Sequence, residues 1–196
     1  MKNTIIIILF LGLFASCEVA STSSSNKVVH YNLKEVLNKQ IDLLLSKEAV
    51  LYKFSIVNDE GDTVKIQPDS LRWGKEFELF FAADINEPAL MGSYSESIEN
   101  DESSNLSVLV FQSLEEDLKV KELKVYYLND LKAIKKITAD YDASQLAVSA
   151  KTRFELSFEE IHNQNLLTSY RVEGYHNMMG TDSLGYTVNA KIEIKE

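Results

Sequence analysis

The sequence predicts an α+β domain built on a curved antiparallel β-sheet, a half-barrel of about seven or eight strands packed with one or two helices. Two observations lead to this fold class. Three long segments near the C-terminus alternate apolar and polar side chains with period two, as strands with one covered face do. Residues 33–46 instead place their apolar side chains at helical spacing.

The first folded element is predicted to be a helix at Leu33–Ser46. Asn32 can cap it, and Glu35 stands at the spacing of a capping box. The apolar side chains that share one helical face are Leu33, Val36, Leu37, Ile41 and Leu44. Acidic residues balance its lysines and the apolar stripe is wide, so packing on a sheet is favoured over lying on a membrane.

A hairpin is expected next. Alternation predicts strands over 50–57 and 63–67, joined by turn residues at 58–62. The turn is acidic, but it lacks the alternating ligands and the closing glutamate of an EF-hand loop. A solvated turn is therefore favoured over a calcium site.

Residues 68–81 are rich in aromatic side chains. Trp73, Phe77, Phe80 and Phe81 share a helical face, which predicts a second helix, although the alternation from Phe77 to Phe81 would also suit a strand. These rings could line a ligand pocket, but packing against the sheet as part of the core is the favoured interpretation.

Most of the remaining chain has strand patterns. Residues 93–105 are serine-rich and acidic, which predicts a long loop. Strands are then expected at 106–112, 119–128, 132–141, 146–158, 166–178 and 186–194. The last three form a meander with turns at 159–165 and 180–185. Since the longest would span roughly 40 Å at about 3.3 Å per residue, and long strands coil, we expect a curved sheet.

The N-terminus has the pattern of an export signal. Lys2 precedes an apolar run from Ile5 to Ala15, which suits a signal-peptide core and is shorter than the about 20 residues that cross a bilayer. The stretch "LFASC" (residues 13–17), which overlaps the end of this run, resembles the lipobox of bacterial lipoproteins, although Phe14 stands where that family usually has Leu or Val. An ordinary cleaved signal and a chance cysteine remain alternatives.

The lipobox resemblance implies cleavage between Ser16 and Cys17 and acylation of Cys17, for example with palmitate. Cys17 is the single cysteine of the chain, so no intrachain disulfide can form. The expected organisation is a signal peptide at 1–16, a lipidated cysteine with a Ser-rich tether at 17–29, and one globular domain at 30–196. The implied location is the cell envelope, with a lipid anchor in a membrane, and the periplasmic or surface face of the outer membrane is favoured.

The net charge of −10 limits the partners. A chain this acidic is a poor candidate for binding nucleic acid, because both would be negatively charged. The sequence also lacks the motifs of serine hydrolases, zinc proteases, phosphate loops and dinucleotide-binding folds. We therefore expect no cofactor and regard an enzyme, such as a hydrolase, as the weaker class.

The three histidines give little support to a metal site. Glu159 and His162 have an E-x-x-H spacing, but such sites need a second copy on a facing helix. His30 borders the tether, where an incidental role is expected. His176 shares the predicted inner face with Tyr170, which favours a core histidine over a polar group in a pocket.

Two functions from different classes remain. The order of elements resembles the half-barrel fold of bacterial lipoprotein carriers and lipid-binding envelope lipoproteins, although no motif residue can be matched. That resemblance implies a hydrophobic cavity for a lipid or acyl chain, and the residues expected to line it are Phe154, Leu156, Phe158, Tyr170, Val172, His176 and Val188. The alternative is an envelope structural or interaction protein, recruited to a membrane-bound assembly through a sheet edge or through residues 93–105.

Overall fold

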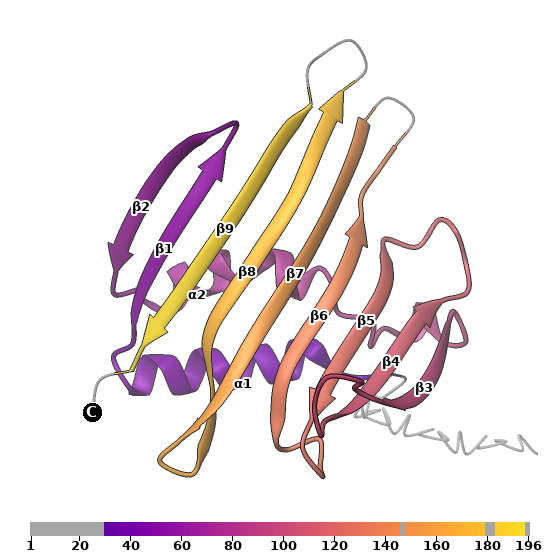
Figure 1. The fold of residues 1–196 in the computed structure, drawn as a ribbon, viewed down its shortest axis with the longest axis horizontal. Coiled ribbons are helices and arrows are strands. Elements are labelled where there is room, and N and C mark those ends of the chain that lie inside the picture. Colours follow the sequence, from indigo (N-terminus) through magenta and orange to yellow (C-terminus); the bar gives the residue numbers. More distant parts are fainter. Residues whose placement is uncertain (1–29, 146–147, 179–182, 195–196) are drawn as a thin grey trace, which may run out of the picture.

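The computed structural model describes residues 30–145, 148–178 and 183–194 (Figure 1). The predicted signal peptide, Ser16, Cys17 and tether lie outside the described residues. The described part of the chain forms an open, curved antiparallel sheet with helices on its concave side, which confirms the predicted fold class. Its helix α1 (Leu33–Ser46) has the predicted bounds.

The sheet has nine strands, in the order β2-β1-β9-β8-β7-β6-β5-β4-β3. From β3 onward each strand pairs with the next, and β9 then returns to pair with β1. The strands are β1 (Val50–Val57), β2 (Glu60–Ile66), β3 (Tyr94–Asn100), β4 (Ser107–Ser113), β5 (Val120–Tyr127), β6 (Ile134–Asp142), β7 (Val148–Ile161), β8 (Gln164–Met178) and β9 (Leu184–Glu193).

Two hairpin turns are shorter than predicted. Asn58 and Asp59 adopt φ values of 46° and 68°, and His162 and Asn163 adopt 51° and 59°. Two consecutive residues with positive φ match the right-handed twist of the flanking strands, so each pair alone reverses the chain. Strands β2, β7 and β8 therefore extend into segments that composition predicts as turns.

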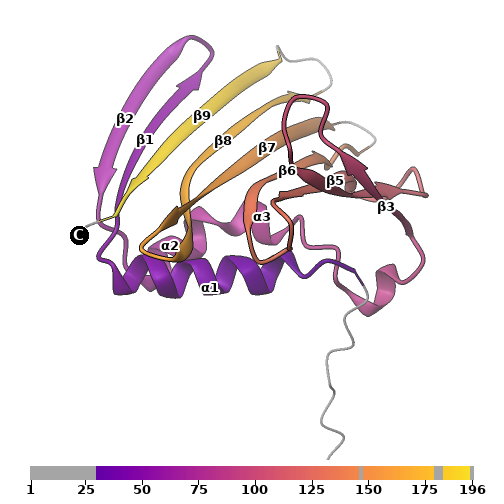
Figure 2. The same cartoon turned by 60° about the horizontal axis from the view of Figure 1, so that its bottom comes forward.

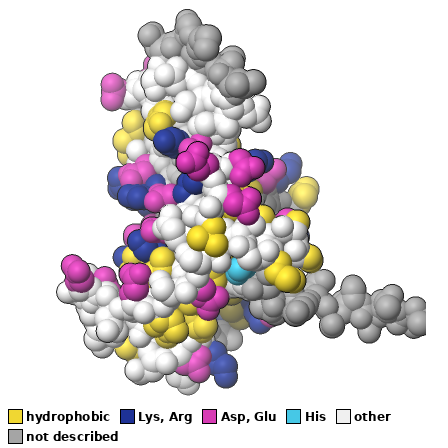
Figure 3. All heavy atoms as spheres, turned by 90° about the vertical axis from the view of Figure 1, so that its right-hand side faces the viewer, with side chains coloured by type: hydrophobic (Ala, Val, Ile, Leu, Met, Phe, Trp, Pro, Cys, Tyr) yellow, Lys and Arg dark blue, Asp and Glu magenta, His cyan; other side chains and the backbone are white. Residues whose placement is uncertain are grey.

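The prediction of a loop at 93–105 is wrong for the first half of this segment. Residues 94–100 form the edge strand β3, which pairs with β4 from Tyr94↔Ser113 to Asn100↔Ser107. All side chains from Ser95 to Asn100 are exposed, so this strand has no buried face and no apolar alternation. This edge faces the viewer in Figure 3.

The helices lie across one end of the strands on the concave side (Figures 1 and 2). The predicted second helix is interrupted at Phe77, which separates α2 (Ser70–Glu76) from α3 (Glu78–Phe81), and a short 3-10 turn follows at η1 (Pro88–Leu90). Asp69 caps α2 by accepting a hydrogen bond from the backbone N–H of Arg72 at 2.8 Å. Helix α1 contacts α2, α3 and β8.

The α1 cap has the predicted partners. The side-chain oxygen of Asn32 accepts from the backbone N–H of Glu35 at 3.0 Å, and the side-chain amide of Asn32 donates to the Glu35 carboxylate at 3.2 Å. The Glu35 carboxylate therefore binds the side chain of the cap residue, whereas a capping box uses the backbone N–H.

A β-bulge changes the register of β8. Ser157 of β7 pairs with Ser169, but Phe158 pairs with Leu167, so one residue of β8 is inserted between the two pairs. Leu167 therefore joins the core on the concave side, whereas unbroken alternation predicts Leu166 there.

Gly174 of β8 allows a close approach between strands. The Tyr186 hydroxyl of β9 reaches across β8 to the Thr152 hydroxyl of β7 at 2.6 Å. A Cβ at Gly174 would lie 2.5 Å from the carbonyl oxygen of Lys151 and 2.7 Å from the Tyr186 hydroxyl. Glycine is therefore required at this position for steric reasons.

We expect Gly174→Ala to lower the free energy of unfolding by about 1–3 kcal/mol, because the new methyl group must displace backbone as well as Tyr186. Urea denaturation measures the change. Gly185→Ala on β9 is the matched control, since a Cβ there meets nothing within 4 Å. Equal stability of the two variants would contradict the steric explanation.

Candidate functional site

The concave face of the sheet is the candidate site, and its two ends differ. At one end, helices cover the sheet with aromatic side chains. Phe80 of α3 lies 4.9 Å from Phe154 and 5.2 Å from Tyr170, measured between ring centroids. Trp73 and Phe77 extend this cluster, and both are fully buried.

Five of the predicted pocket residues lie in this packed end. Phe154, Leu156, Phe158, Tyr170 and Val172 are all buried and belong to the main core. Their partners on the opposite side are the protein's own helices, so the concave face is occupied by core packing at this end. Of five surface pockets of about 410 to 580 Å³, none is lined by these five residues.

At the other end the strands extend beyond the helices (Figures 1 and 2). We call the part of the concave face beyond the helices its free end. Its residues continue the rows of inward-facing core residues along each strand. They are Ser55 and Val57 on β1, Ala150 and Thr152 on β7, Gly174 and His176 on β8, and Leu184, Tyr186 and Val188 on β9. Val57 and Leu184 are each 40% exposed.

The remaining two predicted pocket residues lie at this free end. Val188 is half-buried against the core and pairs with Val172 and Ser55. His176 pairs with Ala150 and Leu184 and is exposed. The prediction of a core position for His176 is therefore wrong, because the helices that bury Tyr170 on the same strand do not extend this far.

A pocket of about 460 Å³ opens beside the free end, at the β1–β2 hairpin. Ser55 and Val57 line it together with Glu60 and Asp62 of β2, to which they are paired. The site thus combines an apolar row of side chains with an acidic border at the edge of the sheet.

A partly buried polar network separates the packed end from the free end. Lys53 of β1 donates to both carboxylate oxygens of Glu76 at 2.7 and 2.9 Å, and the Tyr170 hydroxyl donates to the same carboxylate. Glu76 is the last residue of α2, so the network connects this helix to two strands. Sequence reasoning missed it, because the three residues come from distant parts of the chain.

Burial raises the pKa of several tyrosines. For Tyr170, burial is the largest cause, followed by the hydrogen bond to Glu76 and its charge, and together they move the pKa far above the usual value. Burial also raises the pKa of Tyr31, and it raises that of Tyr94 to about 12, with a smaller contribution from Glu115. The Tyr94 hydroxyl donates to the carbonyl oxygen of Val120 at 3.0 Å.

These shifts predict that the protein loses stability in alkali. Because the folded-state pKa of Tyr170 is raised, its contribution is complete below the unfolded value of about 10 and is lost as the pH rises toward the folded value. We expect Tyr170 alone to account for about 1 kcal/mol of the loss in unfolding free energy between pH 9 and pH 11. Urea denaturation across this range measures it.

Tyr170→Phe is the comparison for this pH dependence. It removes the hydroxyl that titrates, so its unfolding free energy should decline less steeply above pH 10 than that of the unchanged protein. Identical slopes would show that Tyr170 ionises normally in the folded protein.

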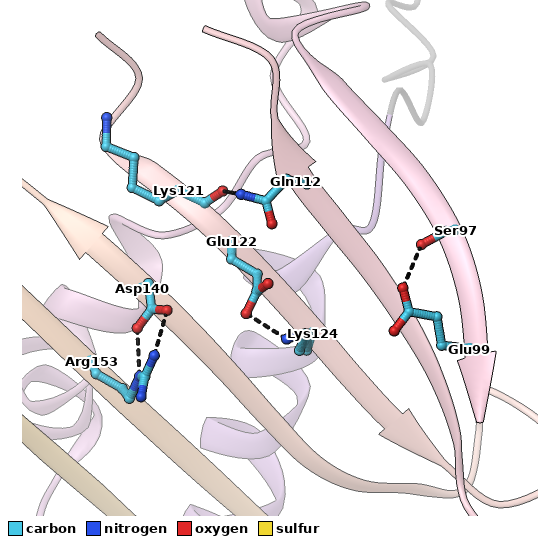
Figure 4. A network of polar contacts seen from close by, with 8 residues as sticks. All are labelled: Ser97, Glu99, Gln112, Lys121, Glu122, Lys124, Asp140 and Arg153. Carbon is cyan, nitrogen blue, oxygen red and sulfur yellow. Dashed lines mark hydrogen bonds and ion pairs between the residues drawn. The ribbon is translucent and has the colours of Figure 1, made fainter. Parts of the chain in front are cut away.

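Several charged side chains on the convex face form ion pairs. Arg153 binds Asp140 through two hydrogen bonds of 2.6 and 2.7 Å, and Lys124 lies 2.7 Å from Glu122 (Figure 4). The bidentate contact with Asp140 raises the pKa of Arg153. Exposed ion pairs of this kind are solvated and contribute little to stability.

His162, which the E-x-x-H spacing singles out, lies in the two-residue turn after β7, where it is exposed. Within the described residues, no group of three or more His, Cys, Asp or Glu side chains could hold a metal ion. In the same residues, no helix is long and apolar enough to cross a membrane.

The fold and the site define an α+β half-barrel: one open, curved antiparallel sheet with helices across one end of its concave face. No protein-family model matches the chain, and no curated protein matches it. A crystal structure of a LolA superfamily protein from Nitrosomonas europaea is similar over 85% of this chain and 95% of that one, with 8% identity and a TM-score of 0.31. Similarity this low does not support an argument about function.

Proposed function

We propose that the protein is a lipid-anchored envelope protein whose domain binds a hydrophobic ligand, such as a lipid or an acyl chain, on the free end of the concave face. The observation that supports this is the continuation of apolar side chains beyond the helices, where Val57, Leu184 and Val188 share one face. Apolar side chains that remain partly exposed on a concave surface are the usual lining of a small-molecule site.

The packed end of the concave face sets the position of the ligand. Phe80 and its aromatic neighbours occupy the space next to Phe154 and Tyr170, so a ligand that leaves this core intact contacts the residues past Val172. The acidic residues Glu60 and Asp62 border the site, which favours a ligand without an anionic head near that edge.

The ligand is tested by native mass spectrometry and solvent extraction of protein purified from its source. We expect a bound amphiphile, and we expect Val57→Ser to reduce the occupied fraction. Phe54→Ser is the matched control, since Phe54 lies on the same strand, is 43% exposed and points to the convex face. Equal losses in both variants, or protein without ligand, would refute the binding function.

The anchor is tested separately by metabolic labelling with palmitate. We expect the unchanged protein to be labelled and to sediment with membranes, and Cys17→Ser to lose both properties, because the lipobox resemblance assigns acylation to this thiol. Equal labelling of the two proteins would refute the anchor and leave the ligand experiment unaffected.

A further inference from the structure

We infer that the β3 edge binds an extended, basic peptide segment of a partner protein by strand addition. The β3 edge consists of Ser95 to Asn100, the exposed residues of the last strand in the sheet order. This inference concerns a second site and does not depend on the proposed ligand.

The backbone of β3 is the first argument. Within the described residues, β3 pairs with β4 and with no other strand, so its outer edge presents unpaired backbone N–H and C=O groups. The pairing with β4 continues through seven residue pairs without a register shift. A regular edge of this length can accept another strand.

The kind of protection on this edge is the second argument. Natural edge strands commonly carry charged side chains, proline or a bulge that discourages pairing, and the charges of β3 are both acidic, so they oppose an acidic strand but not a basic one. The sequence "YSESIEN" of β3 has no lysine or proline, and Ile98 is 68% exposed on it. The opposite edge strand, β2, carries Lys65, whose ammonium lies 4.8 Å from the Tyr52 ring centroid.

The charge of the edge identifies the chemistry of the partner. Alternation places Glu96 and Ile98 on one face of β3 and Ser97 and Glu99 on the other, and Ser97 donates a hydrogen bond to Glu99 at 3.2 Å (Figure 4). Acidic side chains occur on this side of the molecule in the space-filling view, with Lys and Arg side chains among them (Figure 3). Glu115 is one neighbour, because it accepts a hydrogen bond from Ser93 next to the start of the strand.

These features fit a segment with two basic residues three positions apart, which can face Glu96 and Glu99, and an aliphatic residue between them. In an added strand, directly opposite side chains lie close together, so a Lys or Arg can face Glu96 and an aliphatic residue two positions away can face Ile98. A second copy of this chain is disfavoured as the occupant, since two β3 edges would bring their glutamates together.

The experiment uses the full chain and two fluorescent heptapeptides, one with the sequence Thr-Thr-Lys-Val-Thr-Lys-Thr and one with glutamate in place of both lysines. We expect the basic peptide to bind, the acidic one to bind at least about tenfold more weakly, and hydrogen exchange to slow at residues 95–100 when the basic peptide is added. Unchanged exchange at these residues would overturn the inference.

Charge reversal separates strand addition from general attraction to an acidic protein. Glu96→Lys with Glu99→Lys is expected to weaken binding of the basic peptide at least about tenfold. Glu60→Lys with Asp62→Lys is the matched control, because it makes the same charge change on the β2 edge. Equal weakening by both double variants would overturn the inference.

Sedimentation at increasing protein concentration tests whether a second copy of this chain binds the β3 edge. A monomer is expected at all concentrations. A dimer that the β3 double variant dissociates would overturn the inference, because the edge would then bind a second copy of this chain.

Discussion

Replacing Gln40 by leucine is expected to lower the free energy of unfolding by about 2–4 kcal/mol, although Gln40 lies on helix α1 and is not part of the free end of the concave face. Its side-chain amide donates to the carbonyl oxygen of Asn165 at 3.0 Å and accepts from the backbone N–H of Leu167 at 2.8 Å. Gln40 thus supplies hydrogen bonds that a neighbouring strand would otherwise make.

The need for this contact follows from the sheet. Within the described residues, strand β9 pairs with β8 only from Ser169 onward, so the first residues of β8 have no strand partner on that side there. The α1 helix covers this segment and buries it, and Leu167 is fully buried. Leucine at position 40 would leave the buried N–H of Leu167 and the partly buried carbonyl oxygen of Asn165 without these hydrogen bonds, and a buried group left unpaired costs about 1–3 kcal/mol.

Urea denaturation followed by circular dichroism measures the Gln40→Leu effect. Lys39→Ala is the control on the adjacent residue, since the ion pair of Lys39 with Glu35 is exposed and its loss should cost less than about 0.5 kcal/mol. If Gln40→Leu were as stable as the unchanged protein, the helix would not be supplying these hydrogen bonds.

Gln40 also illustrates what the sequence could and could not predict. The bounds and the cap of α1 follow from local spacing, and the structure confirms both. Gln40, however, lies within the apolar face of the helix, and its partners are 125 and 127 residues away. The role of Gln40 arises from the bulge in β8 and from the early end of the pairing between β8 and β9. Neither feature can be predicted from the sequence of the helix.

Some strands could also be predicted from the sequence and others could not. Long strands with one buried face were predicted because burial imposes alternation, as in β7. Strand β3 was missed because all its side chains from Ser95 to Asn100 are exposed, so pairing with β4 requires no apolar pattern. A serine-rich, acidic composition therefore describes this edge strand as well as it describes a loop.

For the site, alternation identified which residues point inward but not what they contact. Phe154, Leu156 and Tyr170 lie on the concave side as predicted. Whether these residues line a cavity or a packed core depends on the helices that face them. The sequence predicts that Phe80 packs against the sheet, which the structure confirms, but it does not predict that the partners of Phe80 are Phe154 and Tyr170. The same limit explains His176, whose strand position was predicted but whose exposure depends on where the helices end.

Replacing Phe80 by alanine is expected to lower the free energy of unfolding by about 3–5 kcal/mol and the melting temperature by roughly 10 °C. Phe80 is 1% exposed and contacts Phe77, Phe154 and Tyr170, so its removal leaves a cavity among rigid rings. Leu71→Ala on α2 is the control, because Leu71 is 70% exposed and its loss should be nearly neutral. Calorimetry compares both variants with the unchanged protein.

At temperatures where Phe80→Ala is still folded, it should retain the amphiphile that Val57→Ser loses, since Phe80 fills the packed end and Val57 lies at the free end of the concave face. A Phe80→Ala variant that is fully stable but has lost its ligand would instead place the ligand beneath the helices, among the residues that the structure shows as core.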